Sequence, residues 1–92
     1  MVTIKIPHIW RPACQNESMV QVQPGSLMQV LQALVERYPM LSQYLFTPQQ
    51  ELQPALNIFI NQEHTRYRGG LQAALQDGDE IHIIPMITGG SQ

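Results

Sequence analysis

Two consecutive glycines near the carboxyl end are the residues with the clearest chemical potential in this sequence. Gly89 and Gly90 are followed by Ser91 and Gln92. Because glycine has no Cβ, such a pair can extend into a channel too narrow for other residues and adopt backbone angles that they avoid. The group that could react is the backbone acyl group of Gly90. It becomes a terminal carboxylate only after the last two residues are removed. The alternative is an ordinary mobile terminus without a role.

The other reactive side chains form no catalytic or metal-binding pattern. The three histidines, His8, His64 and His82, lack the spacing of metal ligands, and no serine, histidine and acid combination resembles a catalytic triad. Cys14 has no predicted helix N-terminus beside it to lower its pKa, so we expect a thiol without chemical function. The sequence therefore predicts no catalytic residue and no bound metal, and we expect that the protein is not an enzyme.

Length and composition limit the classes of function further. The chain has 92 residues, 43% of them hydrophobic and 13% charged, which suits one small folded domain. A net charge of −2 without a basic run argues against nucleic acid as a partner. A single cysteine excludes an intramolecular disulfide, and no apolar run approaches the roughly 18 residues of a membrane helix. We expect a cytoplasmic protein without a membrane partner.

Five short segments alternate apolar and polar residues, which is the pattern of strands with one buried face. In the last of them, Ile84 adds an apolar residue to the face opposite Ile81 and Ile83, so we expect an inner strand. Gly78 supplies the positive φ of a tight turn just before this strand. The five predicted strands cover residues 2–6, 20–23, 56–60, 64–67 and 80–86.

One long helix is predicted between the second and third strands. Ser26 and Gln29 have the spacing of a capping box, in which each side chain bonds to the backbone of the other residue. Apolar residues then recur at helical spacing, and Pro39 disfavours helical geometry at the residue before it. We therefore expect a helix over residues 27–38. The remaining predicted segments are a loop over residues 7–17, helical turns over 40–46 and 71–75, and a glycine turn at 69–70.

The order of these elements predicts the fold. A crossover that contains the helix most simply returns the third strand to the same sheet, and one helix covers only one face of it. The result is an α+β β-grasp, or ubiquitin-like, fold, with a mixed sheet of about five strands packed on one main helix. Its first and last strands lie parallel at the centre. We assign residues 1–86 to this domain and residues 87–92 to a flexible carboxyl-terminal tail.

Four segments of the sequence resemble a known family. Together with the order of the elements, they make the chain similar, over nearly its whole length, to the ubiquitin-like sulfur carriers of the ThiS/MoaD family. Within that family the resemblance is to carriers of the thiocarboxylate-dependent route of cysteine biosynthesis. The segments are Ile6-Pro7 with Arg11-Pro12, residues 57–61 (Asn-Ile-Phe-Ile-Asn), residues 66–71 (Arg-Tyr-Arg-Gly-Gly-Leu), and Asp77-Gly78-Asp79 through Gly90.

The resemblance implies a chemistry for the carboxyl terminus. The terminal carboxylate of Gly90 would be adenylated and then converted to a thiocarboxylate, and Gly89 would help to thread the terminus into the partner enzyme. That partner is an E1-like adenylating and sulfur-transferring enzyme, which holds the ATP and metal, so no cofactor is expected on the chain itself. The implied sulfur acceptor is a pyridoxal-phosphate-dependent enzyme similar to cysteine synthase.

Ser91 and Gln92 depart from the usual end of this family, which stops at the second glycine. We interpret them as an extension that is removed by cleavage between Gly90 and Ser91. The resemblance implies a JAMM-type zinc metallopeptidase for this trimming or for release of the product. The alternative is a permanent extension that leaves the protein inactive as a carrier.

Two surface regions are candidates for partner docking. Trp10 and Arg11 lie in the first long loop and are residue types enriched at interface hot spots, although Trp10 can equally fold back onto the core. Phe59 faces away from the buried side of its strand, so with Ile84 it is predicted on the open face of the sheet. The alternative for these two residues is an ordinary cross-strand pair.

A pair of arginines, Arg66 and Arg68, flanks Tyr67 in the predicted fourth strand. Their charge can steer an acidic partner toward the protein. The alternative is a pair of solvated surface arginines without a specific role.

Three other functions share parts of this pattern. Carriers for thiamine or molybdopterin synthesis use the same terminal chemistry. A ubiquitin-like modifier joined through Gly90 to lysines of other proteins fits the same tail, whereas a non-catalytic β-grasp binding module needs no tail. The sequence alone leaves these alternatives open.

Overall fold

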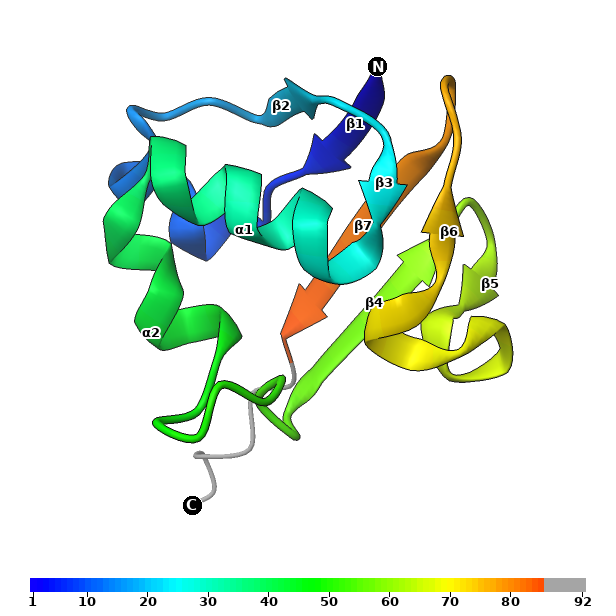
Figure 1. Ribbon diagram of the computed structural model, residues 1–92. Helices are drawn as coiled ribbons and strands as arrows, with labels where there is room; N and C mark the ends of the chain where they lie inside the picture. The colour runs from blue at the N-terminus through cyan, green and yellow to red at the C-terminus, as the bar shows by residue number, and fades with distance from the viewer. Residues whose placement is uncertain (86–92) are drawn as a thin grey trace.

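The computed structural model describes residues 1–85, which form a five-stranded mixed sheet with its helices on one face (Figure 1). The strand order across the sheet is β2-β1-β7-β4-β5. This arrangement confirms the predicted β-grasp fold. The strands of the sheet are β1 (Val2–Lys5), β2 (Met19–Val22), β4 (Leu56–Ile60), β5 (Glu63–His64) and β7 (Glu80–Pro85).

Strands β1 and β7 lie parallel at the centre of the sheet, as predicted. Ile4 is paired with Ile81, and Lys5 with His82. All other pairings in this sheet are antiparallel: β1 with β2, β4 with β7 and β4 with β5. Period-two alternation sets this register, because a slip by one residue would turn the apolar side chains of a strand to the solvent face.

Helix α1 (Leu27–Arg37) packs across one face of the sheet. Its predicted capping box is present: the Ser26 N–H donates to Gln29 Oε1 at 2.9 Å, and the Gln29 N–H donates to Ser26 Oγ at 3.1 Å. The helix ends before Tyr38, where Pro39 disfavours a further helical residue. The predicted turn over residues 40–46 is observed as two short helices, η2 (Pro39–Leu41) and α2 (Ser42–Leu45).

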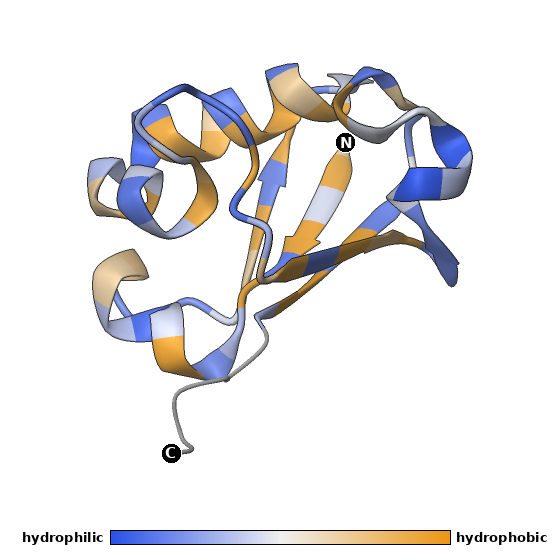
Figure 2. Ribbon diagram, turned by 90° about the horizontal axis from the view of Figure 1, so that it is seen from below, coloured by the Kyte–Doolittle hydropathy of each residue, from blue (hydrophilic) through white to orange (hydrophobic). Residues whose placement is uncertain are grey.

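The hydrophobic core lies between α1 and the sheet. Figure 2, turned by 90°, separates the helical layer from the strands and shows hydrophobic residues recurring along both. Ile4 and Ile81 on the central strands and Leu31 on the helix have no exposed surface. Full burial of one such side chain contributes about 1.5–3 kcal/mol, so this core holds the central strands in place.

Two predicted segments of the second half were wrong, and the first is the strand over residues 64–67. The structure has only two paired residues there, in β5, followed by a 3-10 helix, η3 (Thr65–Arg68). His64 causes the change, because its Nδ1 accepts a hydrogen bond from the Arg66 N–H at 3.0 Å and so caps a helical turn. Gly69, with φ of 97°, then ends the turn.

The second wrong segment is the helical turn over residues 71–75. A shorter 3-10 helix, η4 (Gly70–Gln72), is followed by a strand, β6 (Ala74–Leu75). This strand pairs antiparallel with β3 (Gly25–Ser26), just before α1, to form a second, two-stranded sheet. Strands of two residues have no measurable alternation, so no sequence pattern announces them.

The predicted loop over residues 7–17 also differs, because most of it is a 3-10 helix, η1 (His8–Cys14). The predicted turns at residues 69–70 and 78 are confirmed, since Gly69, Gly70 and Gly78 all have positive φ. The strand predicted over residues 80–86 is observed to Pro85, and Met86 lies outside the described residues, as does the predicted tail over residues 87–92. Within residues 1–85, no helix has both the length and the apolar character needed to cross a bilayer.

Candidate functional site

The described residues show the base from which the proposed reactive terminus extends. Gly89, Gly90 and Ser91 lie outside the described residues, and the last described residue, Pro85, precedes Gly90 by five positions. Pro85 is paired with Leu56 at the start of β4. The described part of the chain therefore ends on the central strand of the sheet.

Strand β7 is held on both sides, by β1 and by β4. Its inward residues Ile81 and Ile83 are buried under the helix. The pairing with β1 covers residues 80–82, and the pairing with β4 covers residues 81–85. A shift in register would break both ladders, and the described end of β7 is held by its pairing with β4.

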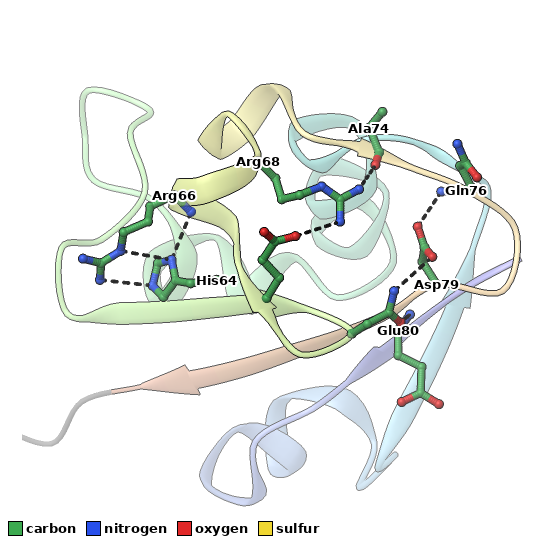
Figure 3. Close-up of polar contacts among 9 residues, drawn as sticks. His64, Arg66, Arg68, Ala74, Gln76, Asp79 and Glu80 are labelled. Carbon is green, nitrogen blue, oxygen red and sulfur yellow. Dashed lines mark hydrogen bonds and ion pairs between the residues drawn. The ribbon is translucent and has the colours of Figure 1, made fainter.

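A polar clasp fixes the beginning of this strand. Asn61 follows β4 and adopts a positive φ of 56°. Its Nδ2 donates to Asp79 Oδ1 at 3.2 Å, while its Oδ1 accepts from the Glu80 N–H at 3.1 Å. Asp79 Oδ2 also accepts from the Gln76 N–H at 2.8 Å (Figure 3). Two of the sequence segments that carry the family resemblance therefore meet in space and lock β4 to β7.

Replacement of Asn61 by alanine is expected to lower the free energy of unfolding by about 1–3 kcal/mol, because two hydrogen bonds are lost and alanine tolerates positive φ poorly. Urea denaturation followed by circular dichroism measures the change. Asn61→Gly keeps the backbone angle without strain and isolates the hydrogen bonds. Gln62→Ala, at the exposed next position, is the control and is expected to change stability by less than about 0.5 kcal/mol.

The open face of the sheet brings together two of the predicted docking residues. Phe59 on β4 is paired with His82 on β7, and Ile84 lies next along β7, opposite Asn57. Ile84 is 49% exposed and Phe59 is half-buried. Together they line a shallow groove of about 320 Å³, whose lining residues are Phe59, Asn61, Gln62, His82 and Ile84. The prediction that Phe59 and Ile84 share the face opposite the helix is confirmed.

The structure does not place the other two predicted docking residues on this surface. Trp10 is only 5% exposed and stacks on Tyr44 of α2, with ring centroids 5.5 Å apart. Of the two interpretations of Trp10, the core alternative is therefore the one observed. Arg11 is half-exposed and contacts His8, with its Nη1 3.3 Å from His8 Nδ1. The short helix η1 explains this outcome, because it turns Trp10 inward and leaves Arg11 at the surface.

Cys14 is a buried residue of the hydrophobic core. Its side chain has no exposed surface, and burial raises the pKa of the thiol above its usual value. Less thiolate is therefore present at neutral pH, and thiolate is the reactive form.

Cys14 in the folded protein is expected to react with a disulfide reagent on the order of 100-fold more slowly than in the urea-unfolded chain. Absorbance of the thiolate released from the reagent, followed against time, gives the reaction rate. Equal rates in the two states would contradict the buried placement.

The raised pKa of the Cys14 thiol also has a consequence for stability. The thiol in the unfolded chain ionises at a lower pH than in the folded protein, so the free energy of unfolding is expected to fall as pH rises above the unfolded pKa.

A cluster that the sequence did not reveal lies at the β5 edge of the sheet. His64 contacts Arg66, as Figure 3 shows, and its ring also meets that of Phe59. Arg66 in turn lies over the ring of Tyr67. The sequence shows Arg66 and Arg68 beside Tyr67, but a strand would have sent these side chains to alternating faces. Their grouping follows from the η3 turn. Across the part of the chain that the structure describes, no group of three His, Cys, Asp or Glu side chains is placed to hold a metal ion.

Comparison with known proteins adds the following findings. The sequence profile of the ThiS family matches residues 11–90. The sulfur carrier protein CysO of Mycobacterium tuberculosis is 35% identical over 91 residues, which cover 97% of this chain and 98% of the relative.

Solved structures give the same picture. A chain of the BexX/CysO complex of Amycolatopsis orientalis has a TM-score of 0.89 and 29% identity, over 98% of this chain and all of that one. The small archaeal modifier protein 1 of Methanosarcina acetivorans has a TM-score of 0.85 and 30% identity, over 97% and 95% of the two chains.

Proposed function

The chain belongs to the ThiS family, and from this membership we propose that it is a sulfur carrier protein that carries sulfur as a thiocarboxylate on Gly90. The single observation that supports this best is the extent of the family match. The match runs from residue 11 to residue 90, so it ends at the second glycine and leaves out Ser91 and Gln92. This end point supports Gly90 as the residue that carries the sulfur. In this proposal the protein is a co-substrate of other enzymes rather than an enzyme.

The proposed reaction begins with activation of a poor acyl donor. A carboxylate oxygen of Gly90 attacks the α-phosphorus of ATP held by an E1-like enzyme, which releases pyrophosphate and leaves an acyl-adenylate. A sulfur donor then attacks the acyl carbon and displaces AMP, so that sulfur replaces one carboxylate oxygen. ATP and its metal belong to the partner enzyme. This chain supplies the acyl group, and Gly89 supplies a backbone without a side chain to pass the partner's channel.

Cysteine synthesis is the pathway that we propose for this sulfur. The support is the 35% identity to CysO over 97% of the chain. The acceptor is then a pyridoxal-phosphate-dependent enzyme similar to cysteine synthase, on which the thiocarboxylate sulfur attacks an activated serine derivative. An acyl shift from sulfur to nitrogen and hydrolysis release the new cysteine. Thiamine and molybdopterin synthesis are alternatives that use the same carrier chemistry with different partners.

The domain body has two tasks in this proposal. It holds the tail on a central strand with fixed register, and it offers Phe59 and Ile84 on the open face as the surface on which the adenylating enzyme docks. A JAMM-type metallopeptidase is proposed to remove Ser91 and Gln92 or to release the product. We place these steps in the cytoplasm, where ATP is available.

The test is loading of a chain that ends at Gly90. The purified chain is incubated with the adenylating enzyme from the same organism, ATP and a sulfide source, and its intact mass is measured. We expect a gain equal to the difference between sulfur and oxygen, and tandem mass spectrometry is expected to place it on Gly90. Absence of that gain, with an enzyme that forms the acyl-adenylate on its own established carrier, would reject the function.

A second candidate function is a protein modifier, because the chain matches a small archaeal modifier protein with a TM-score of 0.85. In that case Gly90 forms isopeptide bonds with lysines of other proteins. Immunoblots of cell extracts under denaturing conditions separate the two functions: ladders that disappear on deletion of Gly90 identify a modifier. Cellular function that survives truncation after Thr88 would instead identify a plain binding module.

A further inference from the structure

The η3 turn forms a second surface site, distinct from the tail. A cleft of about 600 Å³ lies between this turn and the end of β4. The side chains that matter here are Phe59 and His64 on one side and Tyr67 and Arg68 on the other. Neither the terminal chemistry nor the Phe59–Ile84 groove gives a role to Arg66 or Tyr67.

The turn is held in one conformation by hydrogen bonds at both ends. His64 Nδ1 accepts from the Arg66 N–H at 3.0 Å, so the ring proton lies on Nε2, which is 2.9 Å from Asn57 Oδ1. Gly69 closes the turn with its N–H bonded to the Thr65 carbonyl, and Thr65 is buried. A site built on such a turn loses little conformational entropy when a partner binds.

Arg66 presents a guanidinium group that is positioned but not neutralised. Its Nε lies 3.4 Å from His64 Nδ1, and its Cζ lies 5.9 Å from the centroid of the Tyr67 ring. Among residues 1–85, no carboxylate forms an ion pair with Arg66, whereas Arg68 is paired with Glu63 at 3.6 Å and donates to the Ala74 carbonyl (Figure 3). A planar, stacked guanidinium binds carboxylates in a fixed geometry.

Tyr67 supplies apolar contact area beside this charge. It is 72% exposed, more than any other large hydrophobic side chain in the described part of the chain. The floor of the cleft is also aromatic, because the rings of Phe59 and His64 meet edge to face with centroids 5.1 Å apart. Tyrosine and arginine are the residue types most enriched at interface hot spots.

We propose that this cleft, the η3 site, docks an acidic segment of a partner protein that carries an apolar side chain next to its carboxylates. The carboxylate pairs with Arg66, which does not line the cleft itself but lies over the ring of Tyr67 at its edge. The apolar side chain lies in the cleft against Tyr67 and Phe59. Glu63 also lines the cleft, but it is paired with Arg68, so Arg66 carries the only charge there that is not paired among the described residues. One such cation suits a single carboxylate, whereas a nucleic acid backbone needs a row of cations. A protein segment suits the exposed tyrosine better than a small ligand, because small ligands bind in sites that enclose them.

The test uses the full-length chain and two synthetic peptides, acetyl-Asp-Glu-Leu-Asp-Phe-amide and its charge-reversed form acetyl-Lys-Lys-Leu-Lys-Phe-amide. Titration is followed by proton–nitrogen correlation spectra. The acidic peptide is expected to cause saturable shifts at the amides of residues 63–69, and the basic peptide is expected to cause none. Arg66→Gln and Tyr67→Ala are each expected to weaken binding about fivefold or more, while Arg66→Lys retains part of it.

A matched control is available in helix α1. Arg37 also lies over a tyrosine ring, that of Tyr38, at 5.9 Å, but away from the cleft, so Arg37→Gln is expected to leave the affinity unchanged. The proposal is overturned if the acidic peptide gives no saturable shift, if both peptides shift the same amides, or if Arg66→Gln binds like the wild type. The site needs no terminal chemistry, so these outcomes do not depend on the sulfur-carrier function.

Discussion

A chain that ends at Gly90 is expected to accept sulfur in an ATP-dependent reaction, whereas chains that end at Gln92 or at Gly89 are expected to accept none. In the chain ending at Gln92, the acyl carbon of Gly90 is part of a peptide bond and offers no carboxylate oxygen to ATP. In the chain ending at Gly89, the carboxylate lies one residue, about 3.3 Å, closer to the domain. Intact mass after incubation with the adenylating enzyme distinguishes the three chains.

The reason for the strict length requirement lies in strand β7. Strand β7 is paired with β4 as far as Pro85 and clasped at its start by Asn61 and Asp79. A shift of this last strand to make up a missing residue would therefore break the ladder with β4. A misplacement of about 1 Å at a reacting group can already cost on the order of 100-fold in rate. Loading of the chain that ends at Gly89, at a rate close to that of the chain ending at Gly90, would contradict this account.

Gly89→Val, in the chain ending at Gly90, tests the second glycine separately. Its β-branched side chain widens the tail where the proposal needs a narrow one, so loading is expected to fall roughly 100-fold. The domain itself is expected to keep its stability in urea.

Removal of Ser91 and Gln92 is tested by incubation of the full-length chain in native cell extract. We expect its intact mass to change to that of the chain ending at Gly90, and persistence of the full-length mass in an active preparation would reject trimming.

The five-stranded sheet and the main helix could be predicted because their residues obey strong local rules. Ile4 and Ile81 belong to segments with period-two alternation, and burial of one face enforces a single register. The capping box of Ser26 and Gln29 marks the start of α1 within one residue, and Pro39 marks its end. These signals lie in the chain itself, so no tertiary contact is needed to read them.

The segments that were predicted wrongly depend either on the contact of a single side chain or on the pairing of residues far apart in the sequence. His64 ends the short strand β5 because its ring caps the next turn, and histidine is not a usual capping residue. Strands β3 and β6 form because two distant pairs of residues meet. Trp10 left two interpretations open, and only its stacking on Tyr44 decides for the core.

The candidate site likewise has parts that the sequence predicts and a part that it does not. The proposed reactive terminus could be predicted from sequence because it needs a backbone without side chains rather than a constellation of groups, and it stays a prediction. That Phe59 and Ile84 share one face also follows from alternation, whereas the η3 site does not, because it exists only through the turn that His64 stabilises. Docking of a partner on the Phe59–Ile84 groove stays a prediction.

Ile84→Asp is expected to reduce kcat/KM for sulfur loading by a factor on the order of ten or more. Ile84 lies on the same strand that delivers the tail, so a partner that binds the terminus also meets this face of the sheet. A carboxylate placed in an apolar contact must be desolvated on binding, and loss of one hot-spot contact costs about 2 kcal/mol or more. Steady-state loading rates at varied carrier concentration measure the effect, which is expected mainly in KM.

Met40→Asp is the matched control, because Met40 is also a large exposed apolar residue, 59% exposed, but lies on η2 on the helical side of the sheet. Both variants are expected to unfold within about 0.5 kcal/mol of the wild type, since neither residue belongs to the core. An equal loss of kcat/KM in the two variants would show that a negative charge anywhere on the carrier weakens the encounter. A loss confined to Ile84→Asp assigns the docking surface to the open face, and unchanged kinetics in Ile84→Asp would remove this face from the interface.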